Sequence, residues 1–383
     1  MHLQAADYGV DPAAGRSERG HAGTVRPNAF LADLPVFRVA ASSGGASPLI
    51  NLATNESMLG ASPLARAAYA SALDRLHHYP ASGAAALRHA IADAEGLAAS
   101  EICCGAGSEE LITLLARAFA GPGDEVIHSA HGFPLFGLAA RAVGARPIAA
   151  PERALALDVQ AILDRVTRKT RIVFLANPNN PTGALASQGV IRHLRSALPE
   201  DVLLVLDGAY AEYVGEEEDY EAGHALVREG WRNVAVLRTF SKIHGLAGLR
   251  VGWMHAPAAI VECVDRLRGV YNVSLPATLA AAAAITDKAH VARARALTAA
   301  NRGAFLERLA RLGVAPPPSA ANFVLLDFRD RPAMARTVVE RFAAGGVLTY
   351  SGAAAALPDC LRVTIGAASD LRVAAEQLAM ALA

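Results

Sequence analysis

Short apolar segments that alternate with helical segments constrain the fold of this chain more than any other feature. Between about residues 49 and 256, runs rich in Val, Ile and Leu predict strands at Glu125–Ser129, Arg171–Ala176, Val202–Leu206 and Val234–Thr239. Helical periodicity predicts helices among them, at Ser108–Ala120, Asp158–Val166 and Ser187–Leu198. Because buried parallel strands are continuously apolar and need helical crossovers, we predict an α/β domain with a mostly parallel sheet.

The pattern changes after residue 256. Helical periodicity continues to Leu312 and stops at three successive prolines. Strands then follow at Asn322–Phe328 and Leu361–Ile365, with helices at Met334–Ala344 and from Ser369 onward. This order favours a smaller α+β domain. We therefore predict a mobile tail (residues 1–26), an N-terminal segment that packs on the small domain (27–59), a large domain (60–262) and a small C-terminal domain (263–383).

The composition argues against several classes of protein. Lys+Arg and Asp+Glu both number 36, so we expect no basic surface for nucleic acid. The 4 cysteines neither make a disulfide framework nor stand at zinc spacing, and we predict no metal site. No apolar run reaches membrane-spanning length and the N-terminus has no signal-peptide pattern. The expectation is a soluble, cytoplasmic protein.

Polar residues follow the predicted strands where each one ends. The strand at 171–176 runs into the turn Asn177–Gly183, which is rich in proline and asparagine, and the strand at 202–206 runs into Asp207. Parallel strands end at one edge of a sheet, and ligands bind at that edge. A stiff loop and a helix N-cap would also explain these residues taken singly. Together they predict a ligand site.

Two further segments suit an anionic ligand. After the strand at 234–239 come Ser241, Lys242 and Arg250, whose hydroxyl, ammonium and guanidinium groups bind phosphates. A flexible surface loop is the alternative interpretation. Upstream, Gly105–Ser108 opens a helix, and N–H groups at a helix N-terminus bind anions. An ordinary N-cap made by Ser108 explains the same residues.

This set of segments resembles the fold-type I aminotransferases that depend on pyridoxal 5'-phosphate (PLP), and among them the histidinol-phosphate aminotransferase family. The resemblance covers roughly Leu49 to Leu382, and its most specific segment is Arg238–Arg250. The other segments that carry it are Asn55-Glu56, Tyr79-Pro80, Gly105–Glu110, Ala176–Gly183, Asp207–Tyr213, Tyr271-Asn272, Asn322-Phe323 and Leu361–Gly366. It implies a three-layer α/β/α large domain of the aspartate-aminotransferase type and a smaller α+β domain.

The resemblance also implies how PLP is held and used. Lys242 would carry the cofactor as a Schiff base and later move a proton between substrate and cofactor. Asp207 would keep the pyridine nitrogen protonated. Asn180 and Tyr210 would bind the 3'-oxygen of the ring, and Phe133 would stack on its face.

The same resemblance implies a phosphate site and a substrate site. The phosphate site comprises the backbone of Ala106 and Gly107 with Ser108, Thr239, Ser241 and Arg250, and Tyr79 reaching the neighbouring subunit of a homodimer. The substrate's anionic group would bind Arg362, with Asn322 close by. Arg372 is a further candidate, for which a solvated helix position is the alternative interpretation.

Departures from the family pattern concern the substrate pocket. Tyrosines usual in the family are missing at Leu34–Phe37 and at Phe136, and a glutamine is missing near Thr278. We expect amino transfer from L-histidinol phosphate to 2-oxoglutarate, yielding imidazole acetol phosphate and glutamate. The alternatives are an aminotransferase for aromatic or other amino acids in a specialised pathway, a PLP-dependent decarboxylase of amino-acid phosphates, and a non-catalytic PLP-scaffold binding protein.

Overall fold

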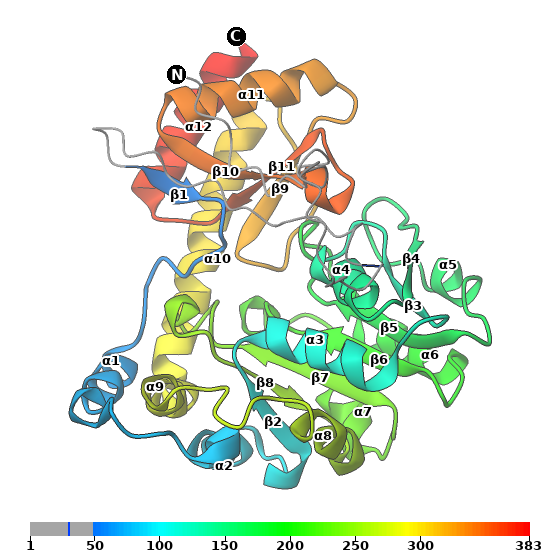
Figure 1. Cartoon of the computed structure of the whole chain (residues 1–383). Helices are drawn as coiled ribbons and strands as arrows, with labels where there is room; N and C mark the ends of the chain where they lie inside the picture. The colour runs from blue at the N-terminus through cyan, green and yellow to red at the C-terminus, as the bar shows by residue number, and fades with distance from the viewer. Residues whose placement is uncertain (1–29, 31–48) are drawn as a thin grey trace, which may run out of the picture.

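The computed structural model describes Phe30 and residues 49–383, and these contain two sheets that a long helix connects (Figure 1). The predicted tail at 1–26 and the segment Leu34–Phe37 lie outside the described residues. The larger sheet has the order β2-β8-β7-β6-β5-β3-β4, and the smaller has the order β1-β10-β11-β9. The predicted combination of a mostly parallel α/β domain with a smaller α+β part is confirmed.

The larger sheet contains all four strands predicted before residue 256. They are β3 (Glu125–Ser129), β5 (Thr170–Ala176), β6 (Leu203–Asp207) and β7 (Val234–Thr239), and they pair in parallel. The sheet also contains β2 (Ile102–Gly105), β4 (Arg146–Ala150) and β8 (Gly252–His255), which the sequence did not predict. Strand β8 runs antiparallel to β7 and β2. These strands were not predicted because they are short and so lack a long apolar run. In β4 the exposed Arg146 shortens the apolar run further.

Helices cover both faces of the larger sheet, because its strands are apolar on both sides. Ile172 and Phe174 of β5 pack with α3 (Ser108–Phe119), α4 (Leu135–Ala142) and α8 (Ala258–Asp265). Val173 and Leu175 face the other way, toward α5 (Val159–Leu163), α6 (Gln188–Ala197) and α7 (His224–Arg228). The three-layer arrangement follows from this alternation of side chains along each strand.

The smaller sheet combines the N-terminal strand β1 (Ile50–Leu52) with β9 (Phe323–Asp327), β10 (Val347–Ser351) and β11 (Cys360–Thr364). Helices α11 (Pro332–Ala344) and α12 (Ala368–Leu382) pack on it. The predicted division at residue 263 stays a prediction. Helix α9 (Leu275–Thr286) packs against α1 (Pro63–Ala70) and α2 (Ala85–Glu95), beside the larger sheet. This packing favours a domain boundary after α9.

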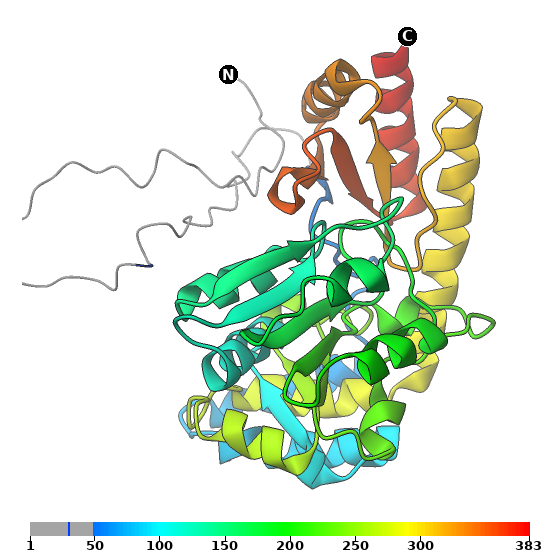
Figure 2. The same ribbon diagram turned by 90° about the vertical axis from the view of Figure 1, so that its right-hand side faces the viewer.

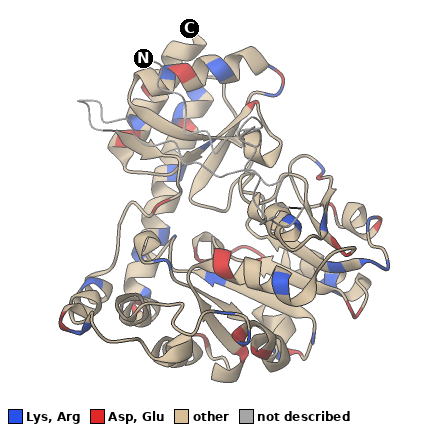
Figure 3. Cartoon of the chain, viewed as in Figure 1, with Lys and Arg blue, Asp and Glu red and all other residues tan. Residues whose placement is uncertain are grey.

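Helix α10 (Lys288–Arg311) runs along both parts of the molecule (Figure 2). Its first half packs near Tyr210, and its second half belongs to the core of the smaller sheet. Acidic and basic residues are interspersed over the described chain in the view of Figure 3. Among the described residues, no helix is both long and apolar enough to cross a membrane.

A buried polar chain lies behind β7. The Arg238 guanidinium donates to Glu212 at 2.8 Å and to Nε2 of His224 at 3.0 Å. The Nδ1 atoms of His224 and His255 are 3.0 Å apart, and Nε2 of His255 is 3.4 Å from Glu101. Because a guanidinium only donates, Nε2 of His224 must accept. The hydrogen of His224 then sits on Nδ1 and is donated to His255. Both imidazoles are therefore neutral in this arrangement.

We predict that this pair makes the fold sensitive to acid. Burial, followed by the nearby Arg238, holds the pKa of His224 well below 6.5. A depressed histidine pKa gives stability that is present above pH 6.5 and lost as pH falls toward the folded-state pKa, by at most about 1.4 kcal/mol per pH unit for each histidine. Urea unfolding between pH 7.5 and 5 should show this slope. His224→Gln should reduce the slope, whereas the exposed His89→Gln should retain it; equal slopes in all three proteins would contradict the assignment.

Candidate active site

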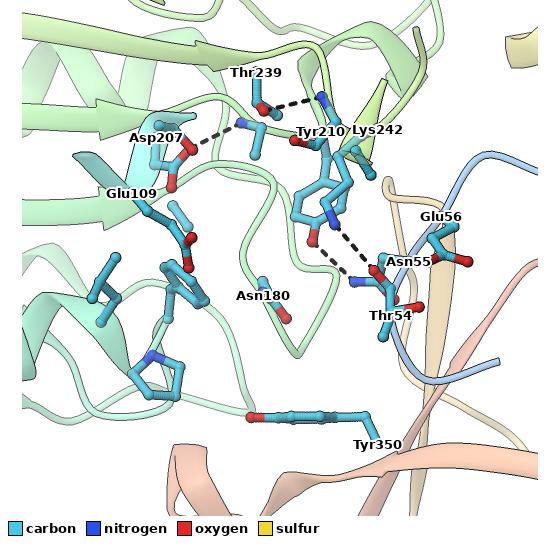
Figure 4. A pocket seen from close by; sticks show the side chains of 18 of the residues that line it. Thr54, Asn55, Glu56, Glu109, Asn180, Asp207, Tyr210, Thr239, Lys242 and Tyr350 are labelled. Atoms are coloured by element: carbon cyan, nitrogen blue, oxygen red, sulfur yellow. Dashed lines mark hydrogen bonds between the residues drawn. The ribbon is translucent and has the colours of Figure 1, made fainter. Parts of the chain in front are cut away.

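A cavity of about 560 Å³ lies where β5, β6 and β7 end and where the smaller sheet approaches them (Figure 4). Its lining includes residues from both parts of the chain. These are Thr54, Asn55, Glu56, Ser108, Glu109, Phe133, Pro134, Leu135, Ala176, Asn180, Asp207, Ala209, Tyr210, Thr239, Ser241, Lys242, Ala247, Arg250, Tyr350 and Arg362.

Asp207 and Lys242 open into this one cavity, although 35 positions separate them in the sequence. Asp207 is the last residue of β6, is 5% exposed, and accepts a hydrogen bond from the backbone N–H of Ala209 at 3.1 Å. Burial raises the pKa of its carboxyl to about 7, although that hydrogen bond and then Lys242 lower it. A buried carboxylate of this kind is most stable beside a cationic group.

Lys242 is partly buried and lines the cavity. Its Nζ donates to the carbonyl of Thr54 at 3.1 Å and lies 5.9 Å from the centroid of the Tyr210 ring. Burial, followed by the charge of Arg362, lowers the pKa of this amine from 10.5 to about 8. The unprotonated fraction near neutral pH is therefore much larger than for an ordinary lysine, and the unprotonated amine is the nucleophilic form.

A cradle for an anion lies at the N-terminus of α3. Arg250 has a left-handed backbone (φ +51°), and its guanidinium reaches Glu109 at 2.9 Å and Ser241 Oγ at 3.4 Å. Gly107 has φ +85°, a backbone conformation that favours glycine, and a Cβ there would lie 2.8 Å from that guanidinium. Thr239 and Ser241 line the same region with their hydroxyls. A helix N-terminus, two hydroxyls and an arginine suit a phosphate.

The backbone N–H groups of Ala106 and Gly107, predicted to bind phosphate, have other partners in this structure. The N–H of Ala106 donates to Glu110 Oε2 at 2.6 Å and that of Gly107 donates to Gly105 O at 2.8 Å, so both donors are already engaged. Neither residue lines the cavity. The alternative interpretation, an N-cap made by Ser108, is not found, because Gly107, with φ +85°, holds the N-cap position. The first turn of α3, with Ser108 and Glu109, faces the cavity instead.

Arg362 reaches the cavity from β11. It donates to Asn180 Oδ1 and to the carbonyl of Ala53, both at 2.5 Å. Its guanidinium stacks 4.2 Å from the centroid of the Tyr350 ring and lies 5.4 Å from that of Phe323. Stacking fixes the plane of the guanidinium, which a forked contact with a carboxylate or phosphate requires.

The remaining predicted residues fall into two groups. Asn180, Tyr210 and Phe133 line the cavity, and Asn322 lies behind it, donating to the carbonyl of Asn55 at 3.1 Å. Arg372 and Tyr79 do not line it.

Arg372 and Tyr79 lie on the surface of the chain. Arg372 is on α12, with Nε 3.8 Å from Glu376 in the following turn, which agrees with the solvated-helix interpretation. Tyr79 is 81% exposed and stacks on Tyr271 with ring centroids 4.6 Å apart. A role for Tyr79 therefore requires a second subunit.

Sequence reasoning missed several lining residues. Glu109 directly follows Ser108 and could have been found from its place in the first helical turn. Thr54 contributes a carbonyl, and Tyr350 lies within the unpredicted strand β10, so neither carried a local signal. Their positions depend on how the smaller sheet approaches the larger one.

Known proteins match most of this chain. A family model described as aminotransferase class I and II matches residues 47–378. The histidinol-phosphate aminotransferase of Dinoroseobacter shibae is 44% identical, with 93% of this chain and 97% of that protein covered. The corresponding protein of Rhodospirillum centenum is 44% identical, with 92% and 97% covered.

Solved structures match a similar share of the chain at lower identity. The histidinol-phosphate aminotransferase of Sinorhizobium meliloti, solved in complex with pyridoxal-5'-phosphate, has a TM-score of 0.88 and 28% identity, with 94% of this chain and 98% of that chain covered. An aspartate aminotransferase mutant of Thermus thermophilus has a TM-score of 0.78 at 23% identity, with 87% and 91% covered, which shows the shared fold.

The lowered pKa predicts how Lys242 reacts in the cofactor-free protein. Reductive methylation with formaldehyde, followed by peptide mass spectrometry, should label Lys242 with a pH midpoint near 8. Arg362→Gln should raise the midpoint, because the positive charge of Arg362 disfavours the ammonium form. Lys169 and Lys288, the other lysines of the sequence, provide internal references in the same digest. A Lys242 midpoint close to 10.5 would contradict this electrostatic environment.

Proposed function

The chain belongs to the class I and II aminotransferase family, and we propose that it transfers the amino group of L-histidinol phosphate to 2-oxoglutarate, giving imidazole acetol phosphate and glutamate. The observation that carries the proposal is the meeting of Lys242, Asp207 and Arg362 in one cavity. The identity of 44% over nearly the whole length of histidinol-phosphate aminotransferases supports this donor.

The cofactor is pyridoxal 5'-phosphate, and the residues of the cavity fit it. A buried carboxylate, an amine with a lowered pKa and an anion cradle surround the same space. When bound, PLP supplies an electron sink for negative charge that develops on the substrate Cα.

Lys242 holds the cofactor covalently in the proposed enzyme and serves as its acid and base. Because the pKa of the amine is about 8, Nζ can take up the proton of the substrate Cα and release it again near neutral pH. Asp207 would pair with the ring nitrogen of the cofactor. A cationic partner at that place would favour the ionised carboxylate that burial alone disfavours.

The anion cradle holds the cofactor phosphate. Its donors are the first-turn N–H groups of α3 and the hydroxyls of Ser108, Thr239 and Ser241. Arg250, which pairs with the Glu109 carboxylate in this structure, would bind the phosphate. Phe133, Asn180 and Tyr210 line the cavity, where Phe133 would cover one face of the ring and the other two would bind its 3'-oxygen.

Arg362 binds the anionic group of the substrate. The stack on Tyr350 keeps its guanidinium flat, and Asn180 and Ala53 hold it toward the cavity. Bidentate contact with a planar or tetrahedral oxyanion follows from this orientation.

The enzyme is proposed to act as a homodimer. Large apolar side chains are exposed at residues 64–79 and 270–271, namely Leu64, Tyr69, Leu73, Leu76, Tyr79, Val270 and Tyr271. Monomeric proteins seldom expose this much apolar surface in neighbouring segments. A second copy covering this surface would bring Tyr79 to the phosphate of its neighbour.

An amino-donor screen tests the proposed reaction. Purified protein with PLP should convert L-histidinol phosphate and 2-oxoglutarate to glutamate faster than it converts aromatic or aliphatic amino acids. Lys242→Ala should reduce turnover by at least a thousandfold, since loss of covalent and general-base catalysis removes contributions of about 10²–10⁴ each. Carbon dioxide released without glutamate would identify a decarboxylase instead, and a variant active without added amine would refute the role of Lys242.

Mixed dimers test the shared site. Tyr79→Ala alone should weaken the binding of PLP, and Lys242→Ala alone should be inactive. Mixing the two chains after dissociation should give dimers in which one site lacks both groups and the other has both, so part of the activity returns. Each single variant, taken through the same dissociation and reassociation without mixing, is the control. No recovery in the mixture would show that Tyr79 does not complete the site of the neighbouring subunit.

A further inference from the structure

Asn55 stands behind Tyr210 and connects it to the smaller sheet. Asn55 is 1% exposed, and its Nδ2 donates to the Tyr210 hydroxyl at 2.9 Å (Figure 4). Its backbone has φ +54°, in the left-handed region that asparagine tolerates better than most residues. The carbonyl of Asn55 accepts a hydrogen bond from Asn322 at 3.1 Å, so the backbone is held independently of the side chain.

Thr364 fixes the orientation of the Asn55 amide. Its Oγ1 lies 3.0 Å from the backbone N–H of Asn55, which can only donate, and 3.0 Å from Asn55 Oδ1. The threonine hydroxyl accepts the first bond and gives its own hydrogen to Oδ1. The Nδ2 group therefore faces Tyr210. An amide NH₂ only donates, so the Tyr210 oxygen accepts in this bond and its hydrogen is directed to a different acceptor.

We propose that Asn55, oriented by Thr364, is a positioning residue that makes Tyr210 a hydrogen-bond donor into the cavity. The inference rests on the proposed function, because the acceptor is the 3'-oxygen of bound PLP. If residue 55 were an aspartate, a carboxylate oxygen would stand in place of Nδ2 and would accept the hydrogen of the Tyr210 hydroxyl. The amide of Asn55 cannot accept that hydrogen at Nδ2, so the hydroxyl can donate it toward the cavity.

A donated hydrogen bond has a measurable effect on the bound cofactor. It stabilises negative charge on the 3'-oxygen and therefore lowers the pKa of the proton that this oxygen shares with the lysine nitrogen. Losing the donor should therefore raise the pH midpoint at which the visible absorption of the lysine-bound cofactor changes. This midpoint is read without substrate and does not depend on turnover.

The test compares variants that remove the orienting bonds. Asn55→Gly keeps a left-handed backbone without strain and deletes the amide, and Thr364→Val deletes the hydroxyl that orients it. Each should raise the midpoint by about 0.5 to 1 pH unit, a three- to tenfold change in proton affinity. Thr364→Ser, which retains the hydroxyl, should restore the wild-type value.

Two controls separate orientation from general disturbance. Thr349→Val removes the hydroxyl of another buried threonine of the small sheet, whose Oγ1 makes no hydrogen bond within the described chain, and should leave the midpoint unchanged. In a Tyr210→Phe background, Thr364→Val should cause no further shift, because the hydroxyl it acts through is gone.

The outcomes separate this inference from the proposed function. Wild-type protein that forms no visible band with PLP would refute the proposed function. A normal wild-type band with unchanged midpoints in Thr364→Val and Asn55→Gly would overturn the role of Asn55 alone, as would a full shift that persists in the Tyr210→Phe background. If Asn55→Gly does not fold, the Val and Ser variants of Thr364 decide the question together.

Discussion

The parallel order of β5, β6 and β7 is the constraint on which the site depends. Three adjacent strands that run in one direction must end at one edge of the sheet, and each ends in a residue of different chemistry. The loop with Asn180 follows β5, the carboxylate of Asp207 ends β6, and the hydroxyl of Ser241 and the amine of Lys242 follow β7. Residues between positions 176 and 242 thereby share one cavity without any local sequence signal that pairs them.

Burial gives these groups their reactivity. The same desolvation raises the pKa of Asp207 to about 7 and lowers that of Lys242 to about 8, so each is moved toward its neutral form. A neutral amine is a nucleophile, and a carboxylate that is costly to ionise alone favours a cationic partner. Both shifts suit one ligand that carries an electrophile at one end and a basic nitrogen at the other.

The sequence predicted the parts of the fold that carry continuous apolar runs. Strands β3 and β7 have the predicted bounds, and the lining positions of Asp207, Lys242 and Arg250 followed from strand ends. The role of Ala106 as a phosphate donor stays a prediction, and the sequence did not indicate that the Glu110 carboxylate, one helical turn further on, accepts from its N–H. The sequence analysis also missed β1, β4 and β10, because short or partly exposed strands lack the apolar run that marks a strand.

The segment Ala53–Asn55 shows why tertiary structure was needed for the rest. Its consecutive residues bind three different groups of the cavity: the carbonyl of Ala53 accepts from Arg362, that of Thr54 accepts from Lys242, and the Asn55 amide donates to Tyr210. The register of β1 against β10, with Leu52 opposite Thr349, fixes which carbonyl meets which cation. A slip by one residue would turn each backbone group to the opposite side. Three contacts that look unrelated in sequence are therefore set by one pairing of three residues at the edge of the smaller sheet.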